Sequence, residues 1–100
     1  MAKVEHIVLL KFKADTAPQQ IDELFEALLE VSENVEGVDE YISGPNSSPE
    51  KLSQGFTHAI VMKFHDAAAR DAYLVHPEHE AFKQKFLPIV ESVVVVDFEL

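Results

Sequence analysis

Cysteine is absent from this 100-residue chain, and so is tryptophan. Without cysteine there are no disulfides, thiolate metal ligands or cysteine nucleophiles, which is typical of a cytoplasmic protein. The sequence also lacks an apolar run near 18 residues, and its N-terminus lacks the long apolar stretch of a signal peptide. We therefore expect neither a membrane span nor secretion.

Glycine and basic residues are scarce as well. The three glycines are Gly37, Gly44 and Gly55, and their spacing matches neither a phosphate-binding loop nor a dinucleotide-binding motif. Eight Lys and Arg residues against 18 Asp and Glu residues give a net charge of −10. An acidic balance of this size is typical of a soluble surface, and it argues against nucleic acid or an anionic membrane as a partner.

Apolar residues make up 47% of the chain, which is enough for a single domain with one core over residues 1–100. Apolar residues recur with a period of two in some segments and with helical spacing in others. This periodicity predicts strands over residues 3–13, 38–46, 56–64 and 92–100, and helices over residues 17–34, 67–75 and from Pro77 onward. The resulting βαββαβ order predicts an α+β, ferredoxin-like fold.

Two of the predicted strands are apolar on both faces. In the first strand Val8 and Leu10 lie on one face, while Ile7 and Leu9 lie on the other, and the last strand holds four consecutive valines at 93–96. A sheet covered by helices on one face leaves its other face bare, and a second copy of the chain is the simplest cover. We therefore expect a homodimer in which two sheets form a dimeric α+β barrel.

Histidines occur at apolar strand positions. His6 shares a face with Val8 and Leu10, and His58 shares a face with Ile60 and Met62. Each could be a core histidine whose ring is satisfied by a backbone carbonyl. Because the two lie in strands of one small sheet, they could also form a polar spot within an apolar cavity.

A tyrosine and two further histidines surround the break between the second and third helices. His76 is expected to cap the helix that begins at Pro77, and His79 is its third residue. A helix N-terminus disfavours a protonated imidazole, so His79 would remain neutral and able to accept a proton. Tyr73 would supply a hydroxyl donor to the same space. The alternatives are helix capping for His79 and simple packing for Tyr73.

A metal site at this break is disfavoured. His76 and His79 could chelate a metal together with Glu78 or Glu80, but no third ligand has suitable spacing for zinc. We expect no metal and no cofactor. The third helix carries Phe82, Phe86, Ile89 and Val90 as its apolar stripe and should bend or end at Pro88.

Four segments resemble the stress-responsive dimeric A/B barrel (Dabb) family: residues 6–13 (HIVLLKFK), 55–58 (GFTH), 73–82 (YLVHPEHEAF) and 95–98 (VVDF). The resemblance implies a ferredoxin-like fold and a homodimer. The family includes a plant polyketide cyclase that needs no cofactor, and the tyrosine and histidine that carry its chemistry fall on Tyr73 and His79. Two histidines that line its cavity fall on His6 and His58.

The cavity wall departs from that cyclase at two positions. An aromatic position in its first helix falls on Leu28, and a tryptophan near the end of its last helix falls on Val90. By analogy with the family, we expect Val93 and Val95 to share the inner cavity with the first strand. The substrate-binding residues predicted for this cavity are His6, Val8, Leu10, Phe25, Leu28, His58, Phe82 and Val90.

Three functions remain open at this point. The first is a small homodimeric stress-responsive protein with an apolar pocket and no assignable reaction. The second is a cofactor-free cyclase or lyase of the aldol type, in which His79 is the base and Tyr73 stabilises the enolate. The third is a monooxygenase of the dimeric-barrel type, which rests on fold analogy alone and gains nothing from a chain without tryptophan. An enclosed cavity that reaches both His79 and Tyr73 would favour the second.

Overall fold

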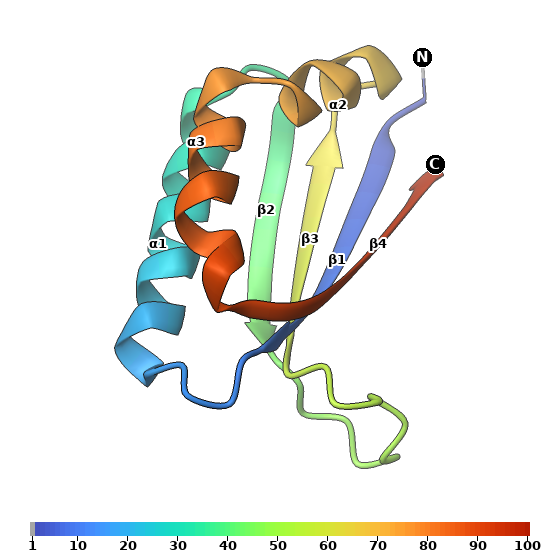
Figure 1. Cartoon of the computed structure of the whole chain (residues 1–100). Helices are drawn as coiled ribbons and strands as arrows, with labels where there is room; N and C mark the ends of the chain where they lie inside the picture. The colour runs from blue at the N-terminus through green and yellow to red at the C-terminus, as the bar shows by residue number, and fades with distance from the viewer. Residues whose placement is uncertain (1) are drawn as a thin grey trace.

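Residues 2–100 are described by a computed structural model, and Met1, with which the predicted domain begins, lies outside them. The elements follow the order β1 (Val4–Phe12), α1 (Pro18–Asn34), β2 (Val38–Pro45), β3 (His58–Phe64), α2 (Ala67–Leu74), α3 (Pro77–Phe86), the 3₁₀ turn η1 (Leu87–Ile89) and β4 (Val90–Glu99). The four strands form one antiparallel sheet in the order β2-β3-β1-β4 (Figure 1). The predicted α+β, ferredoxin-like fold is confirmed.

The break between α2 and α3 is defined by capping residues. The Asp66 carboxylate accepts a hydrogen bond from the Ala69 N–H at 2.8 Å and begins α2. His76 Nδ1 accepts a hydrogen bond from the Glu78 N–H at 3.1 Å, and Pro77 occupies the first position of α3. Proline is favoured there because its missing N–H has no helical partner to lose. The break at His76 and Pro77 therefore lies between Tyr73, near the end of α2, and His79, in the first turn of α3.

The last helix ends earlier than its apolar pattern predicts. α3 ends at Phe86, and Pro88 lies within the short 3₁₀ turn η1. Proline has no backbone N–H to donate, so it is better tolerated in this short turn than inside a longer α-helix. Val90 is therefore the first residue of β4, and its predicted place in a helical stripe is wrong. At the other end of the sheet, β3 begins at His58 rather than at residue 56.

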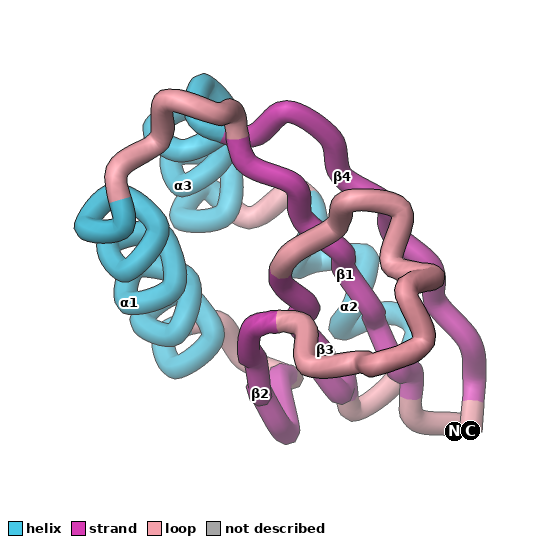
Figure 2. Tube along the Cα trace, turned by 90° about the horizontal axis from the view of Figure 1, so that it is seen from below, coloured by secondary structure: helices cyan, strands magenta, loops and turns pink. Residues whose placement is uncertain are grey.

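The helices cover one face of the sheet. α1 and α3 lie side by side on that face, and α2 lies near the end of β3 (Figures 1 and 2). Strand register places His6, Val8 and Leu10 of β1 on this covered face, together with Val93 and Val95 of β4. The core residues buried there come from β1, β3 and α1 and include Val4, Leu10, Leu24, Leu28, Ile60, Met62 and Phe64.

The opposite face of the sheet carries no helix (Figure 2). Ile7 pairs with Val96 and Val61, and Leu9 pairs with Val94, so apolar side chains line this outer face. Within residues 2–100, no helix has the length and apolar character needed to cross a bilayer.

Candidate functional site

A cavity of about 270 Å³ lies between the covered face of the sheet and helices α1 and α3. Its walls come from all the layers around it: β1, β3 and β4 form the floor, α1 and α3 form the sides, and the end of α2 closes one end. The volume is near the lower end of the range for small-molecule sites, which is about 300–1,000 Å³. The fold therefore provides room for a small ligand.

Most of the wall is apolar, as predicted. Val8, Leu10, Leu28, Phe82 and Val90 all line the cavity. Val93 and Val95 also line it, because the antiparallel register places Val93 beside Leu10 and Val95 beside Val8. Val90 reaches the cavity from the start of β4, although the sequence pattern placed it on a helix.

His79 reaches the cavity from the first turn of α3. Its Nδ1 atom lies 3.3 Å from the Leu74 carbonyl oxygen, which can only accept a hydrogen bond, so Nδ1 carries the proton. In the neutral ring, Nε2 then holds the lone pair. Burial lowers the pKa of His79 below its usual value, and the nearby Lys83 acts in the same direction, while the Leu74 carbonyl opposes them. His79 is therefore a neutral proton acceptor near pH 7.

Tyr73 lies between two histidines. Its ring centroid is 4.2 Å from that of His79 and 6.1 Å from that of His6. Tyr73 is only 2% exposed, and burial raises the pKa of its phenol well above the usual value. The hydroxyl therefore keeps its proton at neutral pH and can serve as a hydrogen-bond donor rather than as a base.

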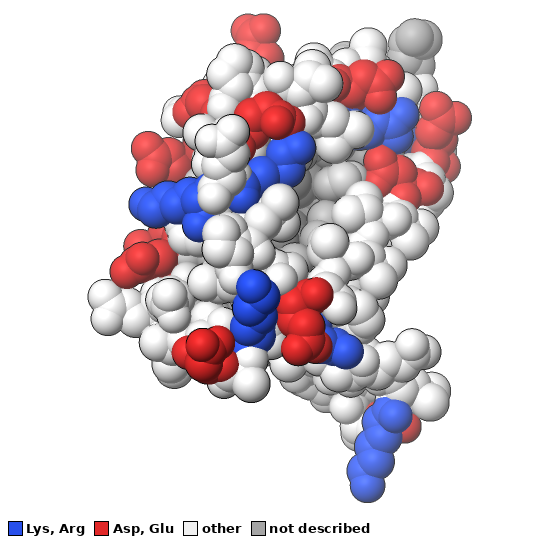
Figure 3. Space-filling model, in the orientation of Figure 1, with Lys and Arg blue, Asp and Glu red and all other residues white. Residues whose placement is uncertain are grey.

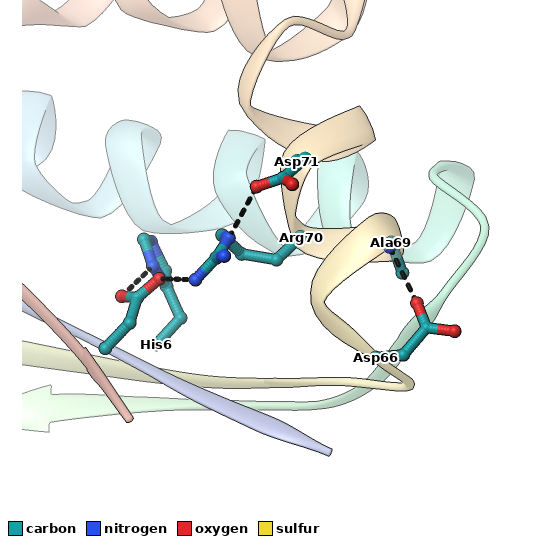
Figure 4. A network of polar contacts seen from close by, with 6 residues as sticks. His6, Asp66, Ala69, Arg70 and Asp71 are labelled. Atoms are coloured by element: carbon teal, nitrogen blue, oxygen red, sulfur yellow. Dashed lines mark hydrogen bonds and ion pairs between the residues drawn. The ribbon is translucent and has the colours of Figure 1, made fainter. Parts of the chain in front are cut away.

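His6 is held by a carboxylate on the neighbouring strand. Its Nδ1 donates to Asp97 Oδ1 at 2.7 Å, and Asp97 Oδ2 accepts from Arg70 Nη1 at 2.9 Å. Figure 4 shows the His6 and Arg70 side chains meeting at one carboxylate, with Arg70 also bonded to Asp71. Because Asp97 accepts from Nδ1, it fixes the tautomer of His6 and leaves Nε2 as the free nitrogen. His6 itself is 5% exposed and lines the cavity.

Asp97 and Arg70 were not identified from the sequence. A signal for Asp97 was present, since Val93, Val95 and Asp97 alternate along one face of β4 and the register pairs Asp97 with His6. Arg70 gives no comparable signal, because it reaches Asp97 across 27 positions of the chain from the side of α2. Only the packing of α2 near the end of the sheet brings it there.

His58 and Phe25 do not reach this cavity, which corrects two of the predicted binding residues. The His58 ring packs against Phe25 at 5.2 Å and against Phe12 at 5.4 Å, and its Nδ1 lies 2.9 Å from the Thr57 hydroxyl. Burial lowers the pKa of His58 as well. His58 faces the helices as expected, but the register places it beside Leu10 rather than beside His6. The predicted convergence of four polar residues therefore reduces to His6, Tyr73 and His79.

The three converging side chains form a set suited to proton transfer. His79 offers a neutral nitrogen, Tyr73 offers a protonated phenol, and His6 offers a nitrogen whose orientation is fixed by Asp97.

Across residues 2–100, no group of three or more His, Asp or Glu side chains is arranged to hold a metal ion.

The family model described as the stress responsive A/B barrel domain (Dabb) matches residues 4–100. The chain belongs to this family. The stress-response A/B barrel domain-containing protein HS1 of Arabidopsis thaliana is 31% identical over 96 residues, which cover 96% of this chain and 88% of HS1. Olivetolic acid cyclase of Cannabis sativa is 22% identical over 95 residues, which cover 95% of this chain and 94% of the cyclase.

Solved structures agree with this assignment. The hydroxynitrile lyase from Passiflora edulis superposes with a TM-score of 0.92 at 27% identity, over 99% of this chain and 94% of the lyase. A dimeric ferredoxin-like protein of unknown function from Jannaschia sp. CCS1 superposes with a TM-score of 0.86 at 28% identity, over 98% of this chain and 99% of that one. The chain is thus a stress-response A/B barrel protein with an apolar pocket, in a family whose members include a cyclase.

Proposed function

We propose that the cavity binds a small apolar carbonyl compound and that His79 and Tyr73 carry out cofactor-free proton transfer on it, as a lyase or cyclase does. The observation that carries the proposal is that a single cavity reaches both side chains. Apolar walls with a few converging polar groups are typical of small-molecule sites. The relatives named as a cyclase and as a hydroxynitrile lyase support a reaction of this kind.

In this proposal, His79 acts as the base and Tyr73 acts as the hydrogen-bond donor. His79 Nε2 takes a proton from the carbon next to the carbonyl group, and the electron pair of that C–H bond moves to form the enolate. Tyr73 donates a hydrogen bond to the enolate oxygen, where negative charge develops. The proton held by His79 then returns to carbon or to a leaving oxygen, so the enzyme ends as it began. His6, oriented by Asp97, lies on the other side of Tyr73 and can bind a second polar group of the ligand.

The second candidate is a stress-associated protein that binds a ligand without converting it. It is favoured by the family assignment and by the relative HS1, whose name describes a stress response and no reaction. Both candidates require an occupied cavity, and they differ only in whether a proton leaves the ligand.

Proton exchange at carbon distinguishes the two candidates. Ethyl 3-oxohexanoate is a small apolar compound with an acidic C–H bond between two carbonyl groups. In D₂O the protein should accelerate deuterium uptake at that carbon, as followed by proton NMR. His79→Gln should abolish the acceleration, whereas His58→Gln, outside the cavity, should retain it. Binding without acceleration would overturn the catalytic proposal and leave the ligand-binding role.

The outer face of the sheet supports the proposal of a homodimer. Val94, Val96 and Phe98 of β4 are 38%, 54% and 50% exposed in the single chain. Val94 pairs with Leu9 and Val96 pairs with Ile7 of β1. Contiguous apolar patches of this kind mark interfaces. A second copy placed sheet against sheet would cover them, and the similar structure from Jannaschia is described as dimeric.

The homodimer is tested by sedimentation at micromolar concentration, which should give about twice 11.2 kDa. Val94→Asp should weaken assembly or folding by several kcal/mol, because a buried unpaired charge is costly. Ala68→Asp on an exposed site of α2 is the matched control and should leave assembly unchanged. A stable wild-type monomer over this concentration range would contradict the dimer.

Cellular location and further partners rest on composition. The absence of cysteine fits a reducing compartment, so we propose that the protein acts in the cytoplasm. The net charge of −10 argues against nucleic acid as a partner.

A further inference from the structure

A lysine side chain lies at the cavity beside the two histidines. Lys83 follows His79 by four positions and precedes Leu87 by four, so all three share one side of the helical segment, and all three line the cavity. Of the described residues that line it, Lys83 is the single Lys, Arg, Asp or Glu. Figure 3 shows basic and acidic side chains together beside the hollow between the helices and β4, and uncharged side chains along the middle of the β4 edge.

Lys83 is available to a ligand at little cost. Its ammonium group pairs with Glu80 Oε1 at 2.7 Å, and the two side chains are 37% and 50% exposed. Exposed pairs between neighbouring turns of a helix contribute little to stability, so another carboxylate can replace Glu80. A lysine stem also packs well along an apolar wall while its charged end remains in water.

We propose that Lys83 makes the cavity selective for small apolar carboxylic acids, with the apolar tail against the sheet and the carboxylate at Lys83. The inference rests on the proposed function only in requiring that the cavity binds a ligand. A neutral ligand of the same length gains nothing from Lys83, and an amine is repelled by it. No acidic side chain among the described residues lines the cavity, so a bound carboxylate meets no repulsion from the wall itself.

Three probes of equal chain length test the selectivity by calorimetry: octanoate, octanol and octylamine. Octanoate should bind about five- to tenfold more tightly than octanol, as expected for one partly exposed hydrogen bond of ordinary net strength, and octylamine should bind least. Higher salt should weaken the binding of octanoate and leave that of octanol unchanged.

Two variants with opposite expected effects sharpen the test. Lys83→Gln should remove the preference for octanoate, and Glu80→Gln should strengthen octanoate binding because it frees the ammonium group. Lys85→Gln is the matched control for charge, since the Lys85 ammonium lies 5.3 Å from the Phe86 ring centroid and does not line the cavity. Glu50→Gln, in the loop after β2, controls for net charge. Circular dichroism confirms that each variant is folded.

The outcomes separate this inference from the proposed function. Equal binding of octanoate and octanol, or an equal loss in Lys83→Gln and Lys85→Gln, would overturn the role of Lys83 while the cavity remains a ligand site. If none of the three probes binds, the ligand-binding cavity fails and the selectivity fails with it.

Discussion

His6 and His58 occupy the same face of neighbouring strands, yet they lie in different environments. His6 lies at the end of the sheet where Tyr73 and His79 converge, and Asp97 holds its ring. His58 lies at the other end, packed between Phe12 and Phe25 with a local contact to Thr57. Both are histidines among apolar strand residues, but only one faces the cavity. The face of the strand alone therefore does not determine whether a histidine reaches the cavity. Its position along the strand determines this.

Strand register gives the physical reason. In the antiparallel pair, His58 lies beside Leu10, and His6 lies beside Met62. His6 and Leu10 are four residues apart on β1, which separates the two histidines by about 13 Å along the strand. At that distance the two imidazoles cannot serve one small ligand.

The largest expected difference between the two ends is catalytic. With ethyl 3-oxohexanoate as probe, His79→Ala should reduce the rate of proton exchange by about 10²–10⁴, because it removes the general base. His58→Ala should leave the rate unchanged while lowering thermal stability through lost ring packing. An equal loss of rate in both variants would contradict the claim that His79, and not His58, acts at the site.

Tyr73→Phe should have the next largest effect. The variant retains the ring between His6 and His79, so the fold should persist, as shown by an unchanged circular dichroism spectrum. It loses the donor to the enolate oxygen, for which a loss of about 10² in rate is expected. A rate equal to that of the wild type would assign Tyr73 to packing alone.

Arg70→Gln should have a smaller effect at the His6 end. Arg70 acts through Asp97, so its loss should shift the imidazole NMR signals of His6 and reduce the rate less than tenfold. Arg70→Lys should partly restore both the His6 signal positions and the rate of proton exchange, and the signals of His58 should not move. Unchanged His6 signals in Arg70→Gln would show that Asp97 orients His6 without help.

The smallest expected effect concerns stability against pH, and both ends contribute. Burial lowers the folded-state pKa of His79 and of His58 below the ordinary value near 6.5. Between the lowered pKa and 6.5 the unfolded chain binds more protons, so the free energy of unfolding should fall as pH drops below about 6.5. His79→Gln and His58→Gln should each flatten this slope by at most one proton in urea unfolding. An unchanged slope in both variants would show that neither ring is desolvated.

Much of the fold follows from local patterns in the sequence. The period of two predicts β1, and the cap residues Asp66 and His76 predict where α2 and α3 begin. Pro88 predicts either a kink or a stop in the last helix, and the chain adopts a 3₁₀ turn there.

The site was predictable only in part. Tyr73 and His79 flank a break that the sequence marks with proline and capping residues, so their proximity could be expected. The separation of His58 depends on register, and the contact of Arg70 depends on how α2 packs. Neither property is encoded in the local pattern of a single strand or helix.

The most direct test follows the histidine imidazole signals by NMR while ethyl 3-oxohexanoate is added to the wild-type protein. The account predicts that the signals of His6 and His79 shift together and saturate at one ligand concentration, while those of His58 stay in place. Shifts confined to His58, or no shift of His79 at saturating ligand, would contradict the assignment of the cavity as the functional site.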